Sequence, residues 1–284
     1  MTEHVLVWHP KVPGEAPAAG GDDQLRLIGM PTGLVRPARQ ALAADQLTPA
    51  ARAVLDRVIA ALRRHAEASG APTRIDFDAL DETDKATVAD ILGEGDVWAK
   101  VGSADTFFRV VESVLAGVWR LEASAADGAT KEWIEVGPVP QAILTASETL
   151  PRATMDVPKQ MPHGAMNVLP LLAELQQRSA AYQPGSENHI INFTLLPITE
   201  VDAQVLTTVL GQIPLVIRSG GYGSSRVFGT GLQHVWAVQY VNSMGNVILD
   251  TLEVGGVPVA VLAAREDFED SGARLVEIMQ AFTS

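Results

Sequence analysis

Cysteine is absent from the 284-residue chain. Its absence excludes disulfides, thiol catalysis, cysteine-ligated zinc and iron–sulfur clusters held by the protein's own thiolates. No apolar run approaches the roughly 20 residues of a membrane-spanning helix, and the longest clean run is 257–264. The first residues, MTEHVLVWHPK, also lack a long apolar run. We therefore expect no signal peptide, no membrane insertion and a cytoplasmic location.

Positive charge and aromatic residues are also scarce. The chain has 21 Lys and Arg against 34 Asp and Glu, for a net charge of -13, and 5% aromatic residues. An acidic surface repels phosphate backbones, so we expect no nucleic-acid partner. Apolar residues reach 47%, which is enough for a buried core and excludes global disorder.

The common catalytic signatures are missing as well. The chain contains no GxxxxGK(S/T), GxSxG or HExxH motif. Its six histidines show no spacing typical of a metal site. We therefore expect no cofactor, no bound metal and no enzymatic activity.

The chain repeats itself at offsets of 116 to 118 residues. The matches keep their order along the sequence, whereas chance matches would scatter. We interpret them as an internal duplication covering about residues 75–146 and 191–264. The matched segments are 75–77 with 191–193, 88–93 with 206–211, 109–110 with 226–227, 118–119 with 235–236, and 134–140 with 252–258.

Each copy is predicted to begin with a helix, a short strand and a second helix. Thr48, followed by proline, is a typical helix start in copy one, and Asn167 is the corresponding cap in copy two. The short strands are predicted at 75–77 and 190–195. The second helix carries start and stop signals in both copies. These signals are Asp81, Thr199, Gly93 and Gly211.

Short connections join the strand-like runs that follow, which favours antiparallel pairing. We therefore predict an α+β fold with two similar halves, each a small antiparallel sheet with helices on one face. A helix at about 270–282 closes the chain. The runs are 97–101, 107–111, 118–121 and 133–136 in copy one, and 214–218, 226–228, 235–241 and 247–254 in copy two.

These patterns divide the chain into four parts. Residues 1–46 form an N-terminal arm rich in proline and glycine, and residues 47–150 form the first α+β repeat. A linker at 151–164 leads to the second repeat at 165–284.

The clearest candidate for a binding site is the stretch 218–226, RSGGYGSSR. Glycine-rich backbone between two arginines is suited to a phosphate or carboxylate. A phosphate cradle usually opens a helix, whereas a strand-like run follows here, so a glycine-rich turn between strands is the alternative. Copy one has far less glycine at this point. The copies therefore diverge most visibly at this loop.

Other candidates have structural alternatives. Trp119 and Trp236 occupy equivalent positions and are either core residues or partner platforms. Glu135 and Glu253 are also equivalent. We consider three roles for them: a general acid/base pair, solvent-facing side chains, or partners of an arginine such as Arg109 or Arg226.

Two further features favour structural roles. His234, just before Trp236, reads as a structural histidine. The acidic run 266–270 is either the charged start of a helix or a patch for a basic partner.

Three long strings resemble the HyaF/HupH-type family of hydrogenase expression/formation proteins. They are 188–197 (NHIINFTLLP), 221–227 (GYGSSRV) and 235–254 (VWAVQYVNSMGNVILDTLEV), extended by 257–258 and 264–271. The resemblance is dense over about residues 160–272, within a HupH-type C-terminal domain. It is weaker in the first half, where 113–119 and 135–140 still fit.

The resemblance implies an accessory protein for uptake nickel–iron hydrogenases. Family members are thought to bind the precursor of the small subunit and to assist or protect its iron–sulfur cluster assembly. A thioredoxin-like hydrogenase chaperone often works beside them. The family often carries a cysteine near position 225, where this chain has Ser225. That difference argues against a role that requires a thiol.

We therefore expect a non-enzymatic maturation chaperone that contacts the small-subunit precursor. The alternatives are a small-ligand or anion-binding protein or enzyme that uses the same loop, and a scaffold that joins other maturation factors. The predicted partner-binding residues are Arg218, Gly221, Tyr222, Gly223, Arg226 and Trp236.

Overall fold

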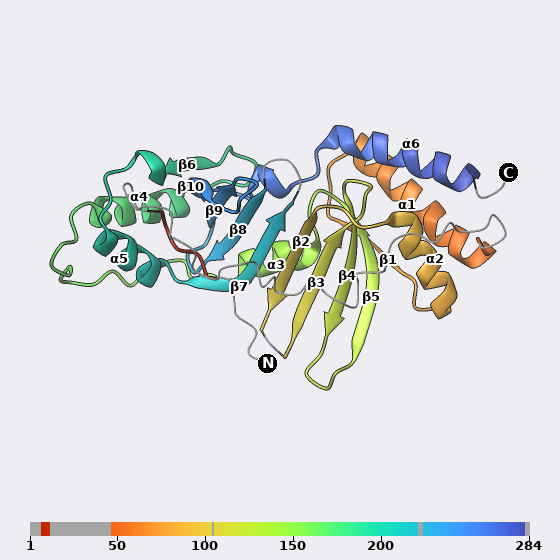
Figure 1. The fold of residues 1–284 in the computed structure, drawn as a ribbon, viewed down its shortest axis with the longest axis horizontal. Helices are drawn as coiled ribbons and strands as arrows, with labels where there is room; N and C mark the ends of the chain where they lie inside the picture. The colour runs from red at the N-terminus through yellow and green to blue at the C-terminus, as the bar shows by residue number, and fades with distance from the viewer. Residues whose placement is uncertain (1–6, 12–46, 104, 221–223, 282–284) are drawn as a thin grey trace. The chain divides into compact units, whose positions relative to one another are not determined.

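The computed structural model describes residues 7–11, 47–103, 105–220 and 224–281 (Figure 1). Contacts divide the chain into two compact units. In the described residues, the first unit comprises 47–143 and 262–281, and the second comprises 7–11 and 144–261. Most of the predicted N-terminal arm, 1–46, lies outside the described residues.

The first unit is an antiparallel sheet in the order β1-β5-β4-β3-β2, with helices on one face. Helices α1 and α6 pack together (Figure 1). Side chains of α1, α2 and α6 share one core with the sheet residues Ile75, Val118 and Ile134. Its elements are α1 (Pro49–Glu67), β1 (Thr73–Asp76), α2 (Glu82–Leu92), β2 (Val97–Gly102), β3 (Phe107–Glu112), β4 (Val118–Ser124), β5 (Thr130–Val136) and α6 (Arg265–Ala281).

The second unit has a matching antiparallel sheet in the order β7-β8-β9-β10-β6. Helices α4 and α5 cover one face of it and form a core with Phe228, Ala237 and Leu252. Its elements are α4 (Val168–Ala181), β6 (His189–Asn192), α5 (Glu200–Leu210), β7 (Gln212–Ser219), β8 (Ser225–Thr230), β9 (Val235–Val241) and β10 (Val247–Val254), with the 3-10 turns η2 (Phe193–Leu195) and η3 (Val259–Val261).

The helix signals read from the sequence are mostly confirmed. Thr48 Oγ1 accepts a hydrogen bond from Ala51 N at 3.1 Å, and Asp81 accepts from the backbone of α2. Thr199 forms a capping box at the start of α5. The equivalent helices α2 and α5 both end at a glycine with positive φ, which is 62° at Gly93 and 64° at Gly211.

Asn167 is the N-cap residue of α4, as predicted, but its side chain does not cap the helix. The Asn167 side chain donates to Pro197 O instead. The start of α4 is capped by Asp202 of α5, whose Oδ1 accepts from the backbone N–H groups of Met166, Asn167 and Val168 at 2.8, 3.0 and 3.1 Å. Burial alone would raise the pKa of Asp202, but hydrogen bonds from Thr199, Met166 and Asn167 hold it below its usual value.

Helix α3 (Gln141–Thr149) was not predicted. Two features mark its start: Pro140 lies immediately before it, and Glu135 Oε2 accepts a hydrogen bond from Gln141 N at 2.8 Å. From Leu144 onward the helix belongs to the second unit, where it lines a pocket with Trp236. Trp236 lies on the face of the sheet opposite α4 and α5. The prediction of helices on one face therefore fits α1, α2, α4 and α5, but not α3.

Other boundaries also differ. Residues 193–195 form a 3-10 turn rather than the end of a strand. The last helix begins at Arg265, before the predicted 270, because Asp267 Oδ2 accepts from Ala264 N at 2.8 Å and caps an earlier start. The acidic run thus occupies the first turns of α6, where the helix dipole favours it. Arg265 Nε also donates to Ala66 O, next to the end of α1.

Candidate functional site

Four polar side chains form a row across the second sheet. Arg218 on β7 lies opposite Arg226 on β8, Arg226 lies opposite Gln239 on β9, and Gln239 lies opposite Asp250 on β10. Directly opposite residues in an antiparallel sheet share one face. We call Arg218, Arg226, Gln239 and Asp250 the second polar row.

The second polar row lies on the helix-covered face, next to the apolar core. The next row on the same face lies two positions away along each strand. It consists of Val216, Phe228, Ala237 and Leu252. All four are buried in the core beneath α4 and α5. Because strand side chains alternate between faces, both rows point the same way. The sheet therefore changes from apolar to charged at this point on one face.

The short N-terminal segment 7–11 covers the Asp250 end of the row. Trp8 Nε1 donates to Asp250 Oδ1 at 3.2 Å, and Lys11 N donates to Oδ2 at 2.7 Å. Gln239 Nε2 donates both to Asp250 Oδ2 at 3.1 Å and to His9 O at 2.8 Å. Asp250 is 0% exposed. Burial raises its pKa to about 6, against the opposing effect of these hydrogen bonds.

The two arginines occupy the other end of the row and are half-buried. Burial, and then the charge of Arg226, lower the pKa of Arg218. Like charges opposite each other on neighbouring strands are destabilising. The Nε–H of Arg226 is buried and, within the described part of the chain, has no hydrogen-bond acceptor. The arrangement is therefore suited to receiving an anion.

The first sheet carries a row at the equivalent positions. Lys100, Arg109, Glu122 and Glu132 lie opposite one another in that order on β2, β3, β4 and β5. We call them the first polar row. Here the arginine has an internal partner, since Arg109 Nη1 lies 3.6 Å from Glu122 Oε1. Gln239 stands in the second row where the first row has Glu122.

Trp236 lies on the opposite face from the arginines. It pairs in register with Gly229 on β8 and Glu253 on β10, and it is 3% exposed. A pocket of about 190 Å³ adjoins it, whose walls include Leu144, Tyr182 and His234. The structure thus brings Arg218 and Arg226 together and places Trp236 apart from them. Gly221, Tyr222 and Gly223 lie outside the described residues.

The two equivalent tryptophans differ in their hydrogen bonding. Trp119 Nε1 donates to Gly137 O at 2.8 Å in a fully buried site. The indole N–H of Trp236 makes no hydrogen bond within the residues that the structure describes. His234 adopts a φ of 59°, and its ring centroid lies 4.7 Å from that of Tyr182 beside the same pocket.

The carboxylates Glu135 and Glu253 are structural. Glu135 accepts from Trp133 Nε1 at 2.7 Å as well as from the start of α3. Glu253 accepts from Asn188 Nδ2 at 3.2 Å. Both are buried, so the expectation that they face solvent or pair with Arg109 or Arg226 is wrong. Neutral donors satisfy them because the arginines lie on the opposite face of each sheet.

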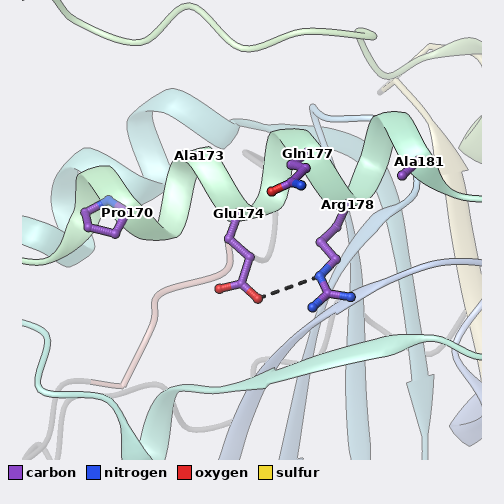
Figure 2. A pocket seen from close by; sticks show the side chains of 6 residues that line it. All are labelled: Pro170, Ala173, Glu174, Gln177, Arg178 and Ala181. Carbon is purple, nitrogen blue, oxygen red and sulfur yellow. Dashed lines mark ion pairs between the residues drawn. The ribbon is translucent and has the colours of Figure 1, made fainter.

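A shallow hollow also runs along the outer side of α4 (Figure 2). Its two charged side chains are engaged: Glu174 Oε1 lies 3.8 Å from Arg178 Nε and also 2.9 Å from Nε2 of His189, on β6. This surface therefore offers a weaker candidate than the second polar row. In the described ranges, no cluster of three or more His, Asp or Glu is arranged to hold a metal, and no helix is long and apolar enough to span a membrane.

Comparisons with known proteins cover nearly the whole chain. The family model for the HupH hydrogenase expression protein, C-terminal conserved region, matches twice, at residues 48–161 and 165–282. The hydrogenase expression/formation protein HupH of Rhizobium leguminosarum bv. viciae is 40% identical over 210 residues, covering 72% of this chain and 74% of that protein. HupH of Rhodobacter capsulatus is 37% identical over 273 residues, covering 95% and 94%.

Two further matches are more distant in sequence. The hydrogenase-1 operon protein HyaF of Escherichia coli (strain K12) is 31% identical over 247 residues, covering 86% of this chain and 85% of that protein. A solved structure of hydrogenase expression protein HupH from Thiobacillus denitrificans is 30% identical, with a TM-score of 0.38, and covers 40% of this chain and 96% of that one.

Proposed function

This chain belongs to the HupH family of hydrogenase expression proteins, and we propose that it is a non-enzymatic maturation chaperone for an uptake nickel–iron hydrogenase. It binds the immature small subunit in the cytoplasm, covers the site of its iron–sulfur clusters and assists or protects their assembly. Binding is useful to the extent that the immature form is preferred over the mature one.

The absence of cysteine supports a contact role over a cluster-carrying role. Protein thiolates are the usual ligands of iron–sulfur clusters, and this chain has none. The observation that carries the binding site is the second polar row: among the described residues, Arg226 faces the neutral Gln239 where Arg109 faces the carboxylate of Glu122. A half-buried arginine in this state is a natural contact for a client protein.

Repetition of the same element order supports an internal duplication. Each half runs helix, strand, helix, four strands and helix, and the family model matches each half once. We infer that two copies of one ancestral unit have diverged. In this view the first copy retained the internally paired row, and the second took on client binding.

The proposal is tested by affinity purification of the tagged protein from cells that make the hydrogenase but lack its large subunit. The precursor of the small subunit accumulates there, and we expect it in the eluate, with or without a thioredoxin-like chaperone. Other maturation factors without the precursor would favour a scaffold. An eluate free of hydrogenase proteins even after crosslinking would contradict the proposal.

The Nε–H of Arg226 is buried and has no hydrogen-bond acceptor among the described residues, which favours one alternative, a protein that binds a small anion. A ligand at about 100 times its Kd stabilises a protein by about 2.7 kcal/mol. A thermal-shift screen with nucleotides and organic anions would reveal such a ligand. The chaperone proposal predicts no such stabilisation by nucleotides; a response to simple carboxylates, which imitate an acidic side chain of the client, is compatible with it.

A further inference from the structure

We propose that Arg226, with Arg218 beside it, binds a carboxylate group of a partner polypeptide, in the place that Glu122 occupies in the first unit. The inference rests on the proposed function only in taking the partner to be a protein. It names the chemistry by which this face of the second sheet recognises that partner.

The two polar rows occupy equivalent positions in the two sheets. Each has two basic side chains on neighbouring strands, followed by two acidic or amide side chains. In the first row the inner basic residue, Arg109, is paired with the carboxylate directly across from it, Glu122. The fold therefore already places a carboxylate against an arginine at this register position.

The second polar row has no carboxylate directly across from Arg226. Gln239 is neutral, and its amide group donates to His9 O and Asp250 Oδ2. Asp250 lies one strand further away and is engaged with Trp8 and Lys11. Strand β9 thus separates Asp250 from Arg226, and the N-terminal segment satisfies the Asp250 carboxylate.

The charge of the two arginines also bears on anion binding. Arg218 and Arg226 face each other, and burial together with the charge of Arg226 lowers the pKa of Arg218. An anion bound at Arg226 would offset this like-charge contact. The arginines are half-buried rather than enclosed, which leaves access from solvent. Guanidinium groups bind both carboxylate and phosphate; the precedent of Glu122 favours carboxylate.

The inference is tested by heteronuclear NMR of the Arg Nε–H groups in the full chain. Glutarate serves as the carboxylate probe and inorganic phosphate as the competitor, at matched ionic strength. We expect a saturable shift of the Arg226 resonance with glutarate, and little response at Arg109, the matched control. A non-saturable response, an equal response at Arg109, or an equal response to phosphate would each overturn the proposal.

Two variants sharpen the test. Gln239→Glu restores the carboxylate of the first row, so it should occupy Arg226 internally and abolish the glutarate response while Arg109 keeps its wild-type resonance. In Arg226→Gln the neighbouring Arg218 resonance should lose its saturable response. Glutarate binding that persists in either folded variant would overturn the assignment.

Failure here is distinguishable from failure of the proposed function. If glutarate does not bind but the wild-type protein still purifies with the small-subunit precursor, the carboxylate site is wrong and the chaperone proposal stands. If glutarate binds Arg226 but no hydrogenase protein is recovered, the site stands and the client assignment is wrong.

Discussion

The two sheets carry the same polar row with one decisive difference. The first unit places Glu122 across from Arg109 and closes the ion pair internally, while the second places Gln239 across from Arg226. Exchanging one carboxylate for an amide leaves the strand, its register and its buried neighbours in place. The first unit therefore holds an ion pair at a position where the second has a neutral amide facing an arginine. Under our proposal, this single difference is enough to give two otherwise similar units different roles, one structural and one in binding an external carboxylate.

The largest expected effect concerns the helix connections. Asp202 caps α4 through three backbone N–H groups and also bonds to Thr199, whereas the equivalent Asp84 Oδ1 accepts from Thr48 Oγ1. Buried donors left unsatisfied cost about 1–3 kcal/mol each. Asp202→Ala should therefore lower the free energy of unfolding by about 3 kcal/mol or more. Urea denaturation would measure it, and an equal loss in Asp84→Ala would contradict the account.

The tryptophans give the next effect. Trp119→Phe removes the hydrogen bond to Gly137 O inside a closed core, and Trp236→Phe removes none within the described residues. The loss of stability should be larger for Trp119→Phe by about 1 kcal/mol. Paired denaturation curves check this. Equal losses would show that Trp236 is as fully bonded as its counterpart.

The arginines themselves should respond in opposite directions. Arg109→Gln leaves Glu122 without its ionic partner and should cost about 1 kcal/mol. Arg226→Gln removes repulsion from Arg218 and should be neutral or slightly stabilising. Thermal unfolding in low salt compares the pair. A greater destabilisation by Arg226→Gln would mean that Arg226 already has an internal partner.

A further effect is a pH dependence shared by both units. Burial raises the pKa of Glu112 to about 7 despite the hydrogen bond from Gly117 N, with help from the charges of Asp267 and Asp96. Burial likewise raises the pKa of Asp250. An acid whose pKa is raised by folding binds its proton more tightly in the folded state, so stability increases as pH falls through that pKa.

The free energy of unfolding should therefore increase as pH falls from about 8 toward 5. Denaturation at a series of pH values measures the slope. Glu112→Gln should flatten the part of the curve around the higher pKa, while Glu148→Gln, at an exposed position on α3, should not. A slope of the opposite sign would contradict the raised values.

Local signals in the sequence predicted most of the fold. Caps and stop residues such as Thr48, Thr199 and Gly211 act within a few residues of where they stand, and alternation marked the strands. Helix α3 was missed because its cap comes from Glu135, six residues earlier and at the end of a strand. The true cap of α4 was missed because Asp202 lies on another helix.

The site was only half predictable. The sequence pointed to Arg218 and Arg226, because two arginines flank an unusual loop. The prediction grouped them with Trp236. On β9, however, Trp236 lies three positions from Gln239, the residue opposite Arg226, and side chains an odd number of positions apart on a strand point to opposite faces. The contact of Trp8 with Asp250 spans 242 residues of sequence. No local pattern predicts such a contact, which engages the acidic end of the second polar row.

The most direct test of the account is the recovery of the small-subunit precursor by three tagged forms of the protein. These are the wild type, Arg226→Gln and Arg109→Gln, expressed to equal levels in cells that lack the large subunit. The account predicts that Arg226→Gln loses most of the precursor while Arg109→Gln retains it. Equal recovery by Arg226→Gln and the wild type would contradict the claim that the second polar row is the client site.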